Sequence, residues 1–165
     1  LKVFINVIKP KPKLIIIGSG NIAKSLAEIA SKIGFEIIIV DDNEITATRK
    51  RFPMARKIIV KPLIEALNEL ELSENDFIAI VHGDIEKEIE VLKVLLMRKL
   101  KYIGLLGSKR KVSEIKRKLI NYGFKEEELK VLHAPIGIDI NAETPSEIAI
   151  SITAELIKVM RGKGK

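Results

Sequence analysis

Short, continuously apolar runs alternate with helical hydrophobic patterns along most of the chain. Runs of this kind are typical of parallel strands that are buried on both faces and joined by crossover helices. They predict an α/β fold, a Rossmann-like doubly wound parallel sheet of about six strands with the order 3-2-1-4-5-6. The expected strands are Lys13–Gly18, Glu36–Val40, Lys57–Val60, Phe77–Val81, Tyr102–Leu106 and Lys130–His133.

Apolar positions three and four residues apart predict the helices between these strands. One covers Asn21–Ile33 and is followed by Gly34, where a C-cap glycine belongs. Others cover Ile85–Leu96 and Val112–Tyr122. The last opens with Thr144-Pro145-Ser146-Glu147, a capping box with proline at the first helical position. Its apolar residues fall on two stripes, so we expect it to pack inside the fold or on another protomer, as in a homo-oligomer.

We expect residues 1–165 to form a single Rossmann-type nucleotide-binding domain. Val3–Ile8 is an additional apolar run, and Lys9–Lys13, with two prolines, forms a stiff connector after it. Residues 1–12 are therefore expected to be a lead-in strand and a proline linker. The apolar run is interpreted either as an edge strand or as the remnant of a preceding domain.

Composition excludes several classes of protein. Apolar residues make up 47% of the chain and charged residues 31%, which suits a domain with a buried core. The absence of cysteine excludes disulfides, thiolate nucleophiles and cysteine-based metal sites, and with two histidines no metal site is expected. Because there is neither a membrane-length apolar run nor a signal-peptide pattern, we expect a cytoplasmic protein that does not use a membrane. The Lys-, Glu- and Ile-rich composition is thermophile-like.

The net charge of +7 is unevenly distributed, since Arg98–Lys118 carries nine basic residues and one acid, Glu114. Such a block either binds an anionic partner or is a solvated helix face. The only aromatic residues near it are Tyr102 and Tyr122, too few for the stacking that nucleic-acid binding favours. A nucleic-acid partner is therefore not expected.

The strongest chemical signal is Gly18-Ser19-Gly20-Asn21-Ile22-Ala23, which follows the first strand and opens the first helix. Gly18 permits the tight turn, Gly20 lets a pyrophosphate approach the backbone, and Ala23 lets the helix lie close to the strand. The N–H groups at the helix start then bind phosphate.

Asp41 completes the dinucleotide-binding pattern, because it ends the second strand 23 residues after Gly18. A carboxylate there accepts hydrogen bonds from ribose hydroxyls and repels a 2′-phosphate, which favours NAD or FAD over NADP. The alternative is a glycine turn that binds nothing, with Asp41 as a helix cap.

His82 directly follows the fourth strand. In the expected strand order it faces Gly18 across the ligand crevice, at the switch point of the sheet. It can hydrogen-bond a phosphate or a substrate oxygen, or transfer a proton as a candidate catalytic residue. The alternative is a histidine that satisfies local backbone groups.

Two further segments supply candidate contacts. Gly107, Ser108 and Arg110 follow the fifth strand and have the makings of a second anion site. They can equally cap a solvated basic helix. Ala134–Pro145 is too apolar for an idle loop and too interrupted by glycine and proline for a regular element, so Asp139 within it is a candidate polar contact.

Together these segments resemble the C-terminal Rossmann domain of the XdhC/CoxI family, the accessory proteins of xanthine dehydrogenase and related molybdenum hydroxylases. The resemblance implies a role in molybdenum-enzyme maturation, because family members bind the molybdenum cofactor and help its sulfuration and insertion. It implies a molybdenum hydroxylase as partner and molybdopterin as a further ligand, and it adds Asp42 to the candidate contacts. The matching segments run in order: Pro12–Ala23, Val40–Asp42, Arg51–Pro53, His82, Tyr102–Lys111 and Ala134–Ala149.

The chain departs from the family pattern at Asn21, where histidine is usual, at Val81, where threonine is usual, and at Asn141, where glycine is usual. Family proteins also carry an N-terminal region with a cysteine implicated in cofactor binding. Any thiolate ligand for molybdenum must therefore lie on a separate N-terminal-domain chain or be absent.

Two alternatives to an accessory module remain open at this point. The first is a small NAD(P)-dependent oxidoreductase with His82 as its acid/base, which the glycine turn supports equally well. The second is a nucleotide-sensing regulatory domain, of the kind that gates a potassium channel, which shares the glycine turn and Asp41.

Overall fold

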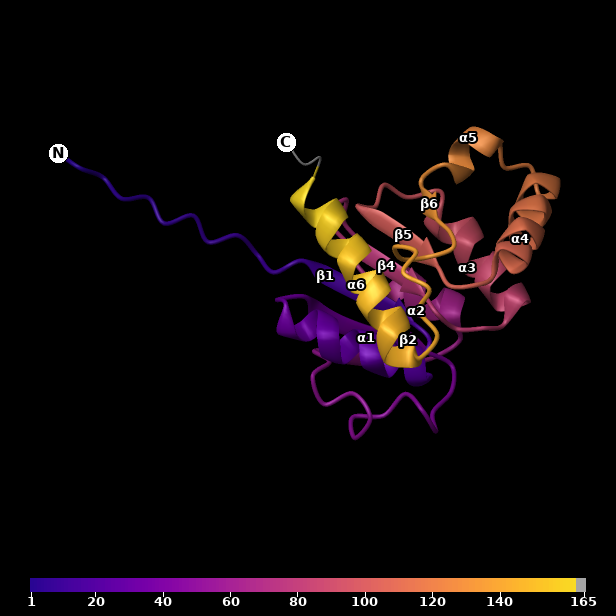
Figure 1. The fold of residues 1–165 in the computed structure, drawn as a ribbon, viewed down its shortest axis with the longest axis horizontal. Helices are drawn as coiled ribbons and strands as arrows, with labels where there is room; N and C mark the ends of the chain where they lie inside the picture. The colour runs from indigo at the N-terminus through magenta and orange to yellow at the C-terminus, as the bar shows by residue number, and fades with distance from the viewer. Residues whose placement is uncertain (163–165) are drawn as a thin grey trace.

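A computed structural model describes residues 1–162, and its centre is a six-stranded sheet in which every neighbouring pair is parallel (Figure 1). The strand order is β3-β2-β1-β4-β5-β6, which confirms the predicted doubly wound topology. The strands are β1 (Lys13–Ile17), β2 (Glu36–Asp41), β3 (Lys57–Val60), β4 (Phe77–Ile80), β5 (Tyr102–Leu105) and β6 (Leu132–His133).

The helices lie on both faces of this sheet (Figure 1). One core contains buried residues of α2, α3 and α4, and the other contains buried residues of α1 and α6. Successive strand residues point to opposite faces, so Ile15 and Ile17 enter the first core while Leu14 and Ile16 enter the second. The helices are α1 (Asn21–Lys32), α2 (Leu63–Glu69), α3 (Ile85–Leu95), α4 (Lys109–Asn121), α5 (Glu126–Leu129) and α6 (Pro145–Arg161).

The capping box predicted for α6 is present. The Thr144 hydroxyl accepts a hydrogen bond from the Glu147 N–H, and the Glu147 carboxylate accepts one from the Thr144 N–H. On one apolar stripe Ile152 and Leu156 are fully buried, whereas Ile150 on the other is 51% exposed. In the single chain, α6 therefore buries one side against the fold and leaves the other outward; a homo-oligomer remains a prediction.

The lead-in strand expected within residues 1–12 is not part of the sheet. This segment has no helix or strand and runs away from the sheet as an extended tail (Figure 1). The physical reason is that β1, which it enters, is a central strand with β2 and β4 on its two sides. A chain arriving at β1 therefore has no open sheet edge beside it, and Val3–Ile8 remains exposed.

The irregular segment after β6 is held by specific polar contacts, as its composition predicts. The Tyr102 hydroxyl is buried and donates to Glu155 of α6 at 2.5 Å, and the same carboxylate oxygen accepts from the Gly137 N–H at 3.2 Å. Burial, followed by this hydrogen bond, raises the pKa of Tyr102 above its ordinary range. The phenol therefore stays protonated and ties β5, the loop and α6 together. Within residues 1–162, no helix is long and apolar enough to cross a membrane.

Gly18 supports a sharp prediction about the fold. Its φ is +122°, and a β-carbon there would lie 2.7 Å from the Val81 carbonyl oxygen. We expect Gly18→Ala to lower the free energy of unfolding by about 1–3 kcal/mol, because it adds backbone strain and a clash with backbone. Gly20→Ala is the control, since a β-carbon at Gly20 meets nothing within 4 Å. Urea denaturation of both variants checks this, and equal losses would contradict it.

Candidate functional site

The predicted glycine turn joins β1 to α1 at the carboxyl edge of the sheet. The Gly18 N–H donates to the Val40 carbonyl at 2.9 Å, which fixes the turn against β2. Gly20 is the N-cap residue of α1, and no side chain caps this helix. The N–H groups of the first helical turn are therefore available to an anion, aided by the positive end of the helix dipole.

Arg51 supplies positive charge to this turn. Its Nε donates to the Ser19 carbonyl at 2.9 Å, and its Nη2 donates to the Asn21 side-chain oxygen at 2.7 Å. Sequence reasoning placed Arg51–Pro53 among the family-like segments but gave the arginine no role. Arg51 lies in the connection between β2 and β3, which folds back so that Arg51 contacts Asn21, 30 positions earlier in the sequence. No local sequence pattern predicts such a contact.

Asp41 is engaged within the protein. It is 5% exposed, its Oδ2 accepts from the Ser19 hydroxyl at 2.5 Å, and its Oδ1 accepts from the Asn43 N–H at 3.1 Å. Burial opposes ionisation, but hydrogen bonds from His82, Ser19 and Asn43 together lower the pKa of Asp41 below its ordinary value. A ribose at this position would compete with Ser19, whereas the neighbouring Asp42 presents a more accessible carboxylate.

His82 lies between the two aspartates. Its Nε2 is 3.4 Å from Asp41 Oδ1 and 3.3 Å from Asp42 Oδ1, while its Nδ1 is placed to accept from the Asp84 N–H at 3.4 Å. Hydrogen bonding to Asp41, assisted by Asp42 and opposed by burial, raises the pKa of His82. The expected proximity to Gly18 is confirmed, since a β-carbon at Gly18 would lie 3.0 Å from the His82 α-carbon.

The same three side chains resemble a metal-binding group, because one ligand atom from each of Asp41, Asp42 and His82 lies within 4.8 Å of the others. In this structure the two aspartates have cationic side chains beside them, where a metal site would have an ion. His82 can carry a proton between the carboxylates, and the Lys87 ammonium lies 2.5 Å from Asp42 Oδ2. Sequence reasoning missed Lys87, which the N-terminal turn of α3 brings to β2. Lys87, together with His82 when it is protonated, can neutralise the two aspartates.

Two cavities open beside the end of β2. One has a volume of about 660 Å³ and is lined by residues that include Asp42, Ile45 and Lys87. The other, of about 310 Å³, shares Asp42 and Lys87 and has Leu63 in its wall. Sites for small molecules typically combine apolar lining with a few polar groups, in a volume of about 300–1,000 Å³. These cavities therefore offer room for a ring system beside Asp42.

The second predicted anion site lies at the start of α4, where β5 ends. The Ser108 hydroxyl caps α4 by accepting from the Lys111 N–H at 3.2 Å, and Arg110 is exposed. The Lys111 ammonium pairs with Glu88 at 2.6 Å, so it does not face solvent as a free charge. Gly107 and Ser108 lie on the same edge as Gly18, separated from it by β4.

Asp139 lies in the exposed part of the loop before α6. Its carboxylate accepts from the Asn141 N–H at 3.3 Å, which stabilises a local turn. The candidate residues thus fall into groups. Gly18, Asp41 and His82 come together with Ser19 and Asp42 at the carboxyl ends of the strands, whereas Gly107, Ser108 and Arg110 start the neighbouring helix and Asp139 sits apart.

Comparison with known proteins gives a consistent result. The XdhC Rossmann domain model matches residues 14–156. A protein of Bacillus subtilis described as a probable component of xanthine dehydrogenase is 32% identical over 158 residues, 96% of this chain and 46% of that protein. The molybdenum cofactor insertion chaperone PaoD of Escherichia coli is 25% identical over 151 residues, 92% of this chain and 41% of that protein.

A solved structure shows the same fold. The crystal structure of a xanthine dehydrogenase from Bacillus halodurans superposes with a TM-score of 0.84 at 35% identity, covering 94% of this chain and 44% of that one. The chain thus spans less than half the length of these relatives. The similarity extends over nearly all of the sheet and its helices.

The His82 cluster predicts a pH dependence of stability. Since the pKa of His82 is raised above its ordinary 6.5, its stabilising contribution is complete below pH 6.5 and disappears as pH rises through the higher folded-state pKa. Since the pKa of Asp41 is lowered, its contribution is present above 3.8 and is lost on acidification. His82→Gln should abolish the alkaline loss. Urea unfolding from about pH 6 to about pH 9 measures it, and identical pH slopes in both proteins would refute the assignment.

The Glu88–Lys111 pair predicts a non-additive mutant cycle. Glu88 is fully buried, so Lys111→Met leaves a carboxylate without its ammonium and should cost about 2–4 kcal/mol of unfolding free energy. In the double variant Glu88→Gln/Lys111→Met the buried charge is gone, and most of that loss should be recovered. Equilibrium unfolding of the single and double variants checks this. Additive losses would mean that the two groups act independently.

Proposed function

The chain belongs to the XdhC Rossmann-domain family, and from this premise we propose that it is an accessory module for a molybdenum enzyme of the xanthine dehydrogenase type. The names of the relatives support this role, since they include a molybdenum cofactor insertion chaperone and a probable component of xanthine dehydrogenase. The molybdenum hydroxylase is the proposed partner. The module is proposed to act in the cytoplasm.

One observation carries the ligand assignment: the start of α1 has no side-chain cap, and Arg51 lies against it. Free N–H groups, the helix dipole and a guanidinium together favour a phosphate or pyrophosphate. The proposed ligand is a dinucleotide such as NAD, or the nucleotide-like phosphate end of molybdopterin. The phosphate binds at Gly18–Ile22, and the ring system extends toward Asp42 and the cavity beside β2.

The residues at the start of α4 could bind a second phosphate of such a ligand. Gly107 lacks a side chain at the strand end, Ser108 starts the helix, and Arg110 points a cation to solvent. These groups can hold a terminal phosphate but supply no soft ligand for a metal. In this proposal the chain binds and presents the cofactor through its phosphate and pterin, and the metal end stays available to the partner enzyme.

The orientation of His82 argues against the alternative of an oxidoreductase that uses it as acid/base. Its Nε2 faces Asp41 and Asp42 rather than the open cavity, and both carboxylates hold the proton there. A general acid or base must reach the substrate proton at hydrogen-bonding distance. The geometry therefore favours His82 as a positioning residue, which fixes the two aspartates, over a catalytic role. A nucleotide-sensing domain would use the same site. The identity of the bound ligand distinguishes that function from the accessory role.

Titration calorimetry with NAD and with molybdopterin tests this proposal. Gly20→Val places a bulky side chain where phosphate approaches, and should weaken binding at least about tenfold by steric exclusion. Lys24→Val is the control, because Lys24 is an exposed residue one turn further along α1. Binding of molybdopterin supports a module that holds the cofactor itself, and binding of NAD alone fits either a dinucleotide-bound accessory module or a nucleotide-sensing domain. No heat from either ligand, or equal affinity in both variants, would overturn the ligand assignment.

A further inference from the structure

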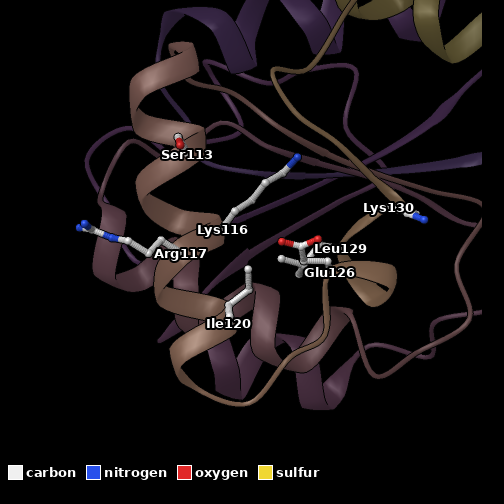
Figure 2. A pocket seen from close by; sticks show the side chains of 7 residues that line it. All are labelled: Ser113, Lys116, Arg117, Ile120, Glu126, Leu129 and Lys130. Carbon is white, nitrogen blue, oxygen red and sulfur yellow. The ribbon is translucent and has the colours of Figure 1, made fainter.

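A cleft of about 440 Å³ lies between α4 and α5, the two helices that precede the edge strand β6 (Figure 2). Ile120 of α4 and Leu129 of α5 supply its apolar lining, and Figure 2 labels both side chains between the helices. Cations rim the cleft, with Lys116 and Arg117 on α4 and Lys130 after α5. The cleft therefore combines an apolar anchor point with positive charge.

The positive charge on α4 is only partly neutralised. Of its six cations, Lys111 pairs with Glu88 at 2.6 Å and Lys118 pairs with Glu86 at 2.5 Å. Within residues 1–162, the other four have no carboxylate within 4.0 Å: Lys109, Arg110, Lys116 and Arg117. Like charges on one helix repel each other, so an acidic partner that binds this face relieves the repulsion.

We propose that the surface formed by Lys116, Arg117, Ile120, Leu129 and Lys130 docks an acidic segment of a partner protein. An apolar side chain of that segment fills the cleft between Ile120 and Leu129, and its carboxylates meet the rim cations. A buried apolar anchor surrounded by polar contacts is the usual anatomy of a protein interface. The inference goes beyond the proposed ligand crevice, since none of these residues lines the cavities beside β2.

The details favour protein over nucleic acid as the occupant. Nucleic-acid surfaces use exposed aromatic rings for stacking, but Tyr122 already lies under the Lys93 ammonium at 4.3 Å, and Phe124 is partly buried against the core. Glu126 lines the cleft and is followed by Glu127 and Glu128, so an anionic partner must direct its charges to α4. An acidic peptide can place its apolar residue here and direct its carboxylates to α4, away from α5.

Fluorescence anisotropy with a labelled peptide tests this proposal on the intact chain. The peptide is an amphipathic helix with glutamate on one face and leucine on the other. We expect Lys116→Glu/Arg117→Glu to weaken its binding at least about tenfold, because attraction becomes repulsion. Lys99→Glu/Lys101→Glu is the matched control, with the same change in net charge at exposed positions before β5. Its affinity should change by less than about threefold.

The apolar anchor has its own test. Ile120→Ser should weaken binding of the leucine peptide but leave a peptide with serine in place of leucine unaffected. Hydrogen exchange adds a readout that does not depend on any variant, with protection by the leucine peptide expected at Ser113–Ile120 and Glu126–Lys130. The proposal fails if both charge-reversed variants bind equally, if the serine peptide binds as well as the leucine peptide, or if protection appears elsewhere. Loss of affinity for an oligonucleotide but not for the peptide would assign the surface to nucleic acid instead.

Discussion

The close approach of β1 and β4 at Gly18 is the constraint on which the site depends. A side chain at Gly18 would collide with the Val81 carbonyl, so only glycine lets the end of β4 lie this near the turn. That approach brings His82 to Asp41, which ends β2 on the other side of β1. The three central strands thus deliver one polar cluster to the edge where Rossmann folds bind ligands.

Much of this arrangement follows from sequence. The buried strands are short apolar runs with few alternatives, and the glycine turn fixes where β1 ends and α1 begins. The strand order alone places Gly18 beside His82. The short helices α2 and α5 were not predicted. They have seven and four residues, which is shorter than the window over which a helical period can be told from other patterns. The lead-in strand is predicted from the apolar residues of Val3–Ile8. Their apolar character does not show that β1, which follows, already has a strand on each side.

The chemical details of the site were less predictable. Sequence pattern assigns Asp41 to ribose, yet the structure shows its oxygens bonded to Ser19 and Asn43. Arg51 and Lys87 reach the site from distant segments, and such contacts depend on how loops return rather than on any local motif. The sequence also does not show which cations of α4 are paired. Lys111 is neutralised by buried Glu88, while neighbouring Lys109 and Arg110 are exposed. The family resemblance and the geometry of these contacts both support the proposed site.

The central claim is that the uncapped start of α1 binds the phosphate of a nucleotide-like ligand. Nitrogen-15 NMR of the backbone amides during titration with inorganic pyrophosphate tests it most directly, since each N–H reports its own hydrogen bond. The account predicts that the largest shifts occur at Gly20–Ala23 and that they saturate. Saturating shifts confined to the start of α4, or no shift at Gly20–Ala23, would contradict it.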